Sequence, residues 1–245
     1  MSEQGGPLVA VIVFPGTNCE LDVVWALDCA GGRGELVFHD VSDLSRYDGA
    51  ILAGGFAHGD YLRPGAIARF SPVMDGLREL AQAGRPVVGI CNGFQVLCEA
   101  GFLPGALQKN AGLTFICAPA NLKVERTASA LTSLCTQGQI LENVPINHFE
   151  GNYTADEATL RSIEERGQVI LRYCGPSGDT SEEWNPNGSA NSIAGICNEA
   201  GNVVGLMPHP ERAMEEITGS TSGRPLLESF VESARQSHGA ALGVK

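Results

Sequence analysis

A cysteine between two glycines is the residue of this sequence best suited to covalent chemistry. Residues 86–97 read PVVGICNGFQVL, so a short apolar run ends at Cys91 and a helix-forming stretch follows it. At a sharp turn from strand to helix, the positions two before and two after a nucleophile must be small, and here they are Gly89 and Gly93. A helix N-terminus also favours the thiolate, the reactive form of cysteine. Free cysteine is more often an inert buried residue, but the two glycines favour a nucleophile elbow with Cys91 at its corner.

A thiol nucleophile needs a base, and a second segment supplies one. Residues 203–207 form an apolar strand-like run, and His209 and Glu211 follow directly, each preceded by a proline. Because prolines hold a chain extended and residues two apart then project to the same side, Glu211 can fix the tautomer of His209. Taken alone, this segment could be a surface turn. His58 and His148, in loops, are weaker candidates for the base.

These residues predict acyl transfer through a thioester. Cys91 would attack a carbonyl carbon while His209 shuttles the proton. The oxyanion would be held by the backbone N–H of Asn92 and by one from the loop of Gly54, Gly55 and Phe56.

The elements that must position these residues follow an alternating pattern. Apolar, β-branched runs predict strands, and helical periodicity separates several of them. The expected strands are 8–14, 36–38, 49–53 and 87–90, and the expected helices are 19–30, 73–83 and 92–100. This order predicts a doubly wound α/β fold, which binds ligands outside the carboxyl ends of its strands, where Gly54 and Gly55 lie.

The second half of the chain predicts more β-structure. Two short pieces, 113–118 and 121–126, are separated by Pro119, and residues 193–197 with 203–207 are expected to form a hairpin. Thr154 and Glu157 form a capping box for a helix reaching about residue 166. A strand at 168–173 and a helix at 225–237 complete the prediction. In the first helix, the apolar side chains Leu21, Val24, Trp25 and Cys29 share one face.

Length and composition limit the classes of function. The 245 residues are sufficient for one α/β domain, and we expect a single domain over residues 1–245. With 16 basic and 28 acidic residues, the net charge of −12 argues against a nucleic-acid partner. No apolar run approaches the ~20 residues of a membrane span and no signal peptide is evident, so we expect a cytoplasmic protein. The eight cysteines include no C-x-x-C pair, and we expect no metal site.

Several motifs together carry a family resemblance. GICNGFQ at 89–95 and MPHPER at 207–212 closely resemble the class I, or triad, glutamine amidotransferases. FPGTNCE at 14–20, GGFAHGDYLRPGAIAR at 54–69 and FLPGALQKN at 102–110 resemble the glutaminase subunits of phosphoribosylformylglycinamidine synthase. The resemblance implies a flavodoxin-like three-layer sandwich with a mostly parallel central sheet. It also implies hydrolysis of glutamine to glutamate, with ammonia supplied to an ATP-dependent synthetase subunit in purine synthesis.

The resemblance further implies how glutamine is held. Gln95, the backbone of Gly54 to Phe56 and the loop at His148 should contact it. The family usually has H-G-E-G at that loop, whereas this chain has a bulky ring at Phe149. No phosphate-binding G-x-x-x-x-G-K-[ST] motif is present, so we expect no cofactor in this chain, with ATP and Mg²⁺ on the synthetase partner. A small accessory subunit is a further candidate partner.

Other functions remain as alternatives. The chain could be a glutaminase serving another synthetase, or a stand-alone cysteine hydrolase, but the long motif at 54–69 argues against both. A non-catalytic regulatory subunit of the same fold would not need Cys91, His209 and Glu211 together.

Overall fold

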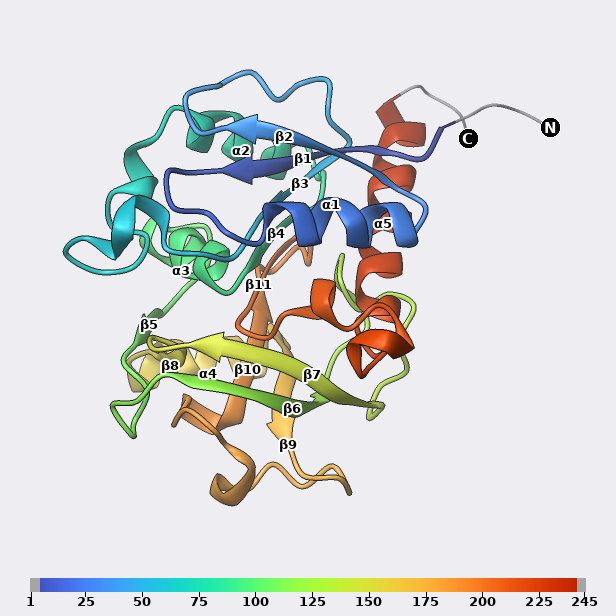
Figure 1. Cartoon of the computed structure of the whole chain (residues 1–245). Coiled ribbons are helices and arrows are strands. Elements are labelled where there is room, and N and C mark those ends of the chain that lie inside the picture. The colour runs from blue at the N-terminus through green and yellow to red at the C-terminus, as the bar shows by residue number, and fades with distance from the viewer. Residues whose placement is uncertain (1–4, 242–245) are drawn as a thin grey trace.

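A nine-stranded mixed sheet forms the centre of the part of the chain that the structure describes, residues 5–241 of a computed structural model (Figure 1). The strand order is β2-β1-β3-β4-β11-β10-β9-β6-β7. The strands are β1 (Leu8–Val13), β2 (Arg33–Phe38), β3 (Gly49–Leu52), β4 (Val87–Ile90), β6 (Ile116–Val124), β7 (Ile140–His148), β9 (Val169–Cys174), β10 (Ile193–Cys197) and β11 (Val203–Leu206). A separate two-stranded sheet pairs β5 (Ala106–Gln108) with β8 (Asn152–Thr154).

The first five strands in this order, β2 to β11, run parallel and form the α/β half of the molecule. The side chains of β3, β4 and β11 are buried throughout, as their continuous apolar sequences require. The helices are α1 (Glu20–Cys29), α2 (Val73–Gln82), α3 (Asn92–Glu99), α4 (Glu157–Glu165) and α5 (Arg224–Ala241). Helix α1 connects β1 to its neighbour β2, and α2 connects β3 to β4 in the opposite direction along the sheet. Because such crossovers are right-handed, α1 and α2 lie on opposite faces of the sheet. Helices therefore cover both faces of a parallel sheet, and the predicted α/β class is confirmed.

The remaining four strands, β10, β9, β6 and β7, extend the sheet in antiparallel pairs. The predicted hairpin of β10 and β11 joins the two halves. The long strand β7 was not predicted. It pairs with β6, which continues through Pro119 instead of breaking there. Pro119 lies outside residues 121–124, the part of β6 that pairs with β9, so its missing N–H interrupts no ladder on that side.

Two predictions about helices are wrong in detail. The helix at 157–165 is capped by Asp156, whose carboxylate accepts from the N–H of Thr159 at 2.7 Å, whereas Thr154 lies in β8. In α1 the buried side chains are Val23, Ala26 and Leu27, while Leu21 and Trp25 are mostly exposed. The apolar residues of α1 are distributed around the whole helix, so their spacing alone could not identify the buried face.

Within residues 5–241, no helix is long and apolar enough to cross a membrane.

Candidate active site

Cys91 occupies the sharp corner between β4 and α3 that the sequence predicted. Its backbone is left-handed, with φ 52° and ψ −106°, a strained conformation for a residue with a side chain. Its N–H donates to the carbonyl of Leu206 at 2.8 Å. A Cβ on Gly89 would lie 2.5 Å from the backbone of Gly93, and a Cβ on Gly93 would overlap the carbonyl oxygen of Leu52. Close backbone packing therefore requires both glycines.

His209 and Glu211 lie together in the same buried region. Nδ1 of His209 donates to Oε1 of Glu211 at 2.6 Å, and both side chains are almost fully buried. Burial alone would lower the pKa of His209, but the charges of Glu211 and Cys91 outweigh it and raise that pKa well above 6.5. With Nδ1 committed to Glu211, Nε2 is the atom available for proton transfer, and it has no hydrogen-bond partner among the described residues.

Gly54, two residues after the end of β3, lies between the nucleophile and the base. A Cβ placed on it would be 2.9 Å from Cε1 of His209 and 3.5 Å from Cβ of Cys91. The same point is 3.2 Å from Sγ of Cys19, a second buried cysteine. A side chain at this position would therefore be too close to His209 and Cys19, so glycine is required unless they move.

Cys19 was not predicted as a site residue. Its sulfur accepts from Nη2 of Arg212 at 3.3 Å, and Arg212 also donates to Asp22 at 3.0 Å. The ligand atoms of Cys19, His209 and Glu211 lie within 4.8 Å of one another, a spacing that could admit a metal ion. The guanidinium on the sulfur places positive charge beside that spot, so the donor set does not favour a cation. The signal for Cys19 and Arg212 was present, since both belong to the motifs FPGTNCE and HPER.

The predicted oxyanion donors require one correction. The N–H of Phe56 donates to the carbonyl of Gly16 at 2.8 Å and so is not free to hold an oxyanion. Gly55 has φ 148°, and a Cβ there would clash with the backbone of residues 16–18. Asn92 is the first residue of α3, where a helix leaves its N–H without an intrahelical acceptor. Gly55 and Asn92 thus remain as the candidate pair.

A network of side-chain amides supports the turn after Cys91. The Asn92 side chain accepts from the N–H of Ala57 at 2.9 Å, and its Nδ2 donates to Asp60 at 3.1 Å and to Gln95 at 2.7 Å. Gln95 in turn donates to the backbone carbonyl of Glu150 at 2.6 Å. The predicted substrate residue Gln95 thus connects the elbow helix to the loop that follows β7.

His148 lies at the end of β7 and is buried. Its Nδ1 is 3.1 Å from Oδ1 of Asn110, and Nε2 has no partner among the described residues. Because Oδ1 of Asn110 also accepts from the N–H of Gly151, the shared hydrogen bond identifies Nδ1 as the protonated nitrogen of His148. Burial, with the nearby His209, lowers the pKa of His148 to about 4. His148 is therefore neutral at physiological pH and can accept a hydrogen bond at Nε2.

Cys91 and His209 line one cavity of about 200 Å³, whereas Gly54, Asn92 and Glu211 are not part of its lining. The cavity is lined by Asn18, Cys19, Gly55, Phe56, Asp60, Cys91, Gln95, Asn147, His148, Phe149, Glu150, His209 and Arg212. His58 is not among them and contacts the rings of Phe14 and His39. Phe149, which replaces the first glycine of the H-G-E-G pattern, lies in the lining.

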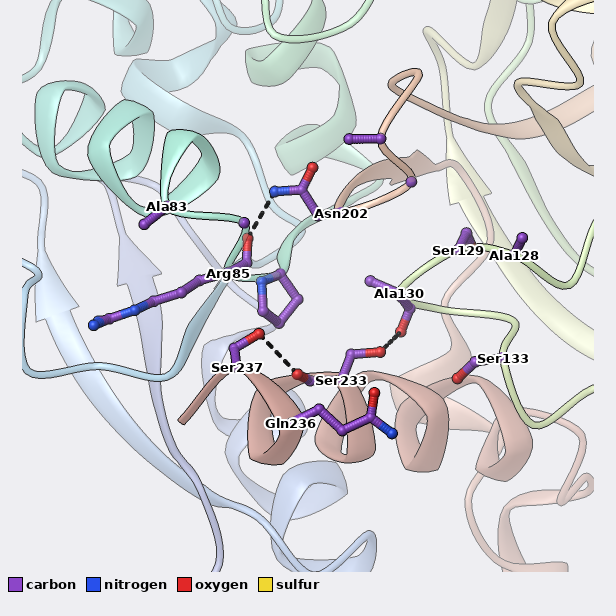
Figure 2. Close-up of a pocket in the computed structure, with 14 residues that line it drawn as sticks. Ala83, Arg85, Ala128, Ser129, Ala130, Ser133, Asn202, Ser233, Gln236 and Ser237 are labelled. Atoms are coloured by element: carbon purple, nitrogen blue, oxygen red, sulfur yellow. Dashed lines mark hydrogen bonds between the residues drawn. The ribbon is translucent and has the colours of Figure 1, made fainter. Parts of the chain in front are cut away.

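A larger cavity of about 690 Å³ lies where β4 and β11 begin, at the end of the sheet away from Cys91 (Figure 2). Its lining contains small and neutral polar side chains, among them Ser129, Ser233 and Asn202. The guanidinium of Arg85 is bound to the carbonyls of Ser45 and Tyr47. Since none of its lining residues is a cysteine, histidine or carboxylic acid, this cavity lacks the groups for acyl transfer.

Comparisons with known proteins agree with the geometry. A model of the CobB/CobQ-like glutamine amidotransferase domain matches residues 6–233. The phosphoribosylformylglycinamidine synthase subunit PurQ of Gloeobacter violaceus is 53% identical over 231 residues, covering 92% of this chain and 97% of that protein. The subunit of the same name from Koribacter versatilis is 50% identical over 222 residues, covering 90% and 96%.

Solved structures are also similar. The structure of PurLQS from Thermotoga maritima contains a chain that is 38% identical, with a TM-score of 0.82, covering 93% of this chain and 98% of that one. A putative GMP synthase protein from Thermoplasma acidophilum, at 14% identity and a TM-score of 0.57, shares the fold and covers 96% of this chain and 98% of that one.

Proposed function

The chain belongs to the CobB/CobQ-like glutamine amidotransferase family, as a glutaminase subunit of phosphoribosylformylglycinamidine synthase, and we propose that Cys91, His209 and Glu211 are its catalytic triad. The observation that carries the proposal is that Cys91, at a strained elbow, lines the same cavity as His209, which is hydrogen-bonded to the buried Glu211. The reaction is hydrolysis of glutamine, and its ammonia serves purine synthesis.

The first half of the proposed mechanism forms a thioester. Sγ of Cys91 attacks the carboxamide carbon of glutamine, and the N–H groups of Gly55 and Asn92 stabilise the oxyanion. Because its pKa is raised, His209 holds a proton, which Nε2 delivers to the leaving nitrogen. Collapse of the intermediate breaks the C–N bond and releases ammonia.

The second half hydrolyses the thioester. Nε2 of His209, now deprotonated, takes a proton from water as the water attacks the thioester carbon. The carbon–sulfur bond then breaks, glutamate leaves, and the proton on His209 balances the charge of the restored thiolate. Throughout, the carboxylate of Glu211 keeps the imidazole in the required tautomer and stabilises its charged form.

The partners and the setting follow from the same assignment. The Thermotoga maritima relative belongs to a PurLQS assembly, and this chain works with a synthetase and with a small accessory subunit in the same way. We assign ATP and Mg²⁺ to the synthetase and no cofactor to this chain. We also propose that the protein is cytoplasmic and that residues 1–245 form one domain. Glutamine contacts are assigned to Gly54, Gln95 and His148.

The decisive experiment separates glutamine from ammonia as the nitrogen source. In the complex reconstituted with its synthetase, Cys91→Ala should abolish glutamine-dependent synthesis and preserve synthesis from added ammonia. Cys29→Ala, at the end of α1 and outside the cavity, is the matched control and should retain both activities. Glutamine-dependent synthesis that survives in Cys91→Ala would disprove the assignment of the nucleophile.

A further inference from the structure

Two carboxyl groups line the active-site cavity without a salt bridge. Asp60 and Glu150 both belong to the lining, and among the described residues neither has a cationic partner within 4.0 Å. Lys109 acts on Glu150 only from a longer distance. The triad chemistry uses neither carboxyl group, so both need another explanation.

Asp60 is held in place by the residue beside the nucleophile. Because Oδ1 of Asn92 is occupied by the N–H of Ala57, its Nδ2 must point toward Asp60 and Gln95. Asp60 itself has a left-handed backbone with φ 52°, a conformation that costs free energy and is often found at functional sites. Its carboxyl group therefore has a fixed position, one amide away from Gln95.

Glu150 lies at the other end of the same network. Gln95 donates to its backbone carbonyl at 2.6 Å. Asp60, Gln95 and Glu150 thus line the cavity, and the side chain of Asn92 connects Asp60 to Gln95 by hydrogen bonds.

The surroundings of both acids disfavour the negative charge. Burial raises the pKa of Asp60 to about 6, and the charge of Glu150 adds to the effect. Burial also raises the pKa of Glu150. A partly buried carboxylate without a cation destabilises the folded protein, and a bound cation would remove that cost. Glutamine brings such a cation, its α-ammonium group.

We propose that Asp60 and Glu150 bind the α-ammonium group of glutamine and select for a free amino acid. The inference rests on the proposed glutaminase function. With the carboxamide at Cys91 and its oxygen directed to Asn92, the aliphatic chain of glutamine leads along the wall toward Gln95, where the two carboxylates lie. An amide without an α-ammonium group leaves the negative charges of Asp60 and Glu150 without a cation and therefore binds weakly.

Substitution by the isosteric amide tests this role, since Asn at position 60 can still accept the hydrogen bond from Asn92. The assay is synthesis by the complete complex, with either glutamine or its des-amino analogue, 4-carbamoylbutanoate, as nitrogen donor. For Asp60→Asn we expect KM for glutamine to rise about 10- to 100-fold, the range for a hydrogen bond to a charged group. The kcat/KM for the des-amino analogue should stay within about twofold of wild type, so that the preference for glutamine is lost.

Three controls make the result specific. Asp75→Asn, an exposed substitution in α2, should leave both substrates unaffected. Synthesis from added ammonia should be unchanged in Asp60→Asn, which shows that the complex is intact. The melting temperature at pH 7.5 should be equal or higher in Asp60→Asn, because an unfavourable charge is removed, whereas a purely structural role would lower it.

The inference is overturned if Asp60→Asn and Glu150→Gln lower kcat/KM equally for glutamine and for the des-amino analogue, or lower it for neither. Glu150→Gln is the second variant should Asp60→Asn fail to fold, and it should shift the preference in the same direction. Failure of the glutaminase assignment looks different, since wild type would then use ammonia but not glutamine.

Discussion

Gly54→Ala is a sharp test of how the catalytic groups are held. The new Cβ would lie 2.9 Å from Cε1 of His209 and 3.2 Å from Sγ of Cys19, whereas ordinary contacts begin at 3.4 Å. The backbone of Gly54 does not have a positive φ, so alanine itself is tolerated there and only the contacts are strained. Gly54 follows the buried residues Leu52 and Ala53, so the side chains around it must move.

The expected loss follows from the size of that movement. Relieving the contact displaces the imidazole by about 0.5 Å or more, and a misplacement of about 1 Å can cost about 10²-fold in rate. We therefore expect kcat/KM for glutamine to fall about 10- to 100-fold in Gly54→Ala. Overpacking a buried site should also lower the free energy of unfolding by about 1–3 kcal/mol.

Two measurements check this prediction. One is glutamine-dependent synthesis by the complete complex, and the other is the rate at which iodoacetamide alkylates Cys91, followed by mass spectrometry. Both should fall, while synthesis from added ammonia is retained. Gly5→Ala is the control, because its Cβ would make only an ordinary contact of 3.5 Å with Arg33. A folded Gly54→Ala protein with wild-type kcat/KM would refute the argument that this glycine sets the position of His209.

Two further substitutions address the histidines. Glu211→Gln keeps a side chain of the same shape but removes the carboxylate that raises the pKa of His209. We expect kcat to fall by up to about 10⁴-fold and the pH dependence of Cys91 alkylation to change. An unchanged pH profile would contradict the role of Glu211 as the partner of His209. The pKa of His148 is about 4 in the folded protein and about 6.5 in the unfolded chain. Between these pH values the unfolded chain binds a proton that the folded protein does not. The free energy of unfolding therefore decreases as pH falls through this window, by up to about 3 kcal/mol. In His148→Gln this contribution is absent, and the free energy of unfolding, measured with denaturant from pH 4 to 7, should fall less steeply than in wild type; an identical slope would show that His148 is not held neutral.

Local sequence patterns were sufficient to predict the parallel half of the fold. The elements around β1, β3 and β4 combine continuous apolar runs with clear turn residues, so their predicted boundaries differ from the structure by at most one residue. The antiparallel half was harder, since polar and apolar residues do not alternate regularly along β7 and a proline lies at 145. Its pairing with β6 depends on contacts between distant segments, which no local pattern contains.

The site divides in the same way between local and distant information. Cys91 and its two glycines form a local motif, and the structure reproduces the predicted corner. The hydrogen bond that occupies the N–H of Phe56 could not be predicted, because its acceptor, the carbonyl of Gly16, lies in another loop. Asp60 was likewise missed, because its position in the site depends on a hydrogen bond from the side-chain amide of Asn92, which only the fold orients.

The relative position of nucleophile and base is set by the register of two adjacent strands. In the parallel pair of β4 and β11, Ile90 is opposite Leu206, so Cys91 is the first residue after one strand and His209 the third after the other. The N–H of Cys91 donates to Leu206, which ties the elbow to the strand that delivers the base. Because side chains alternate along a strand, a one-residue change of this register would direct the wrong faces toward the core. The register of the buried central sheet therefore brings Cys91 and His209 to the ends of adjacent strands.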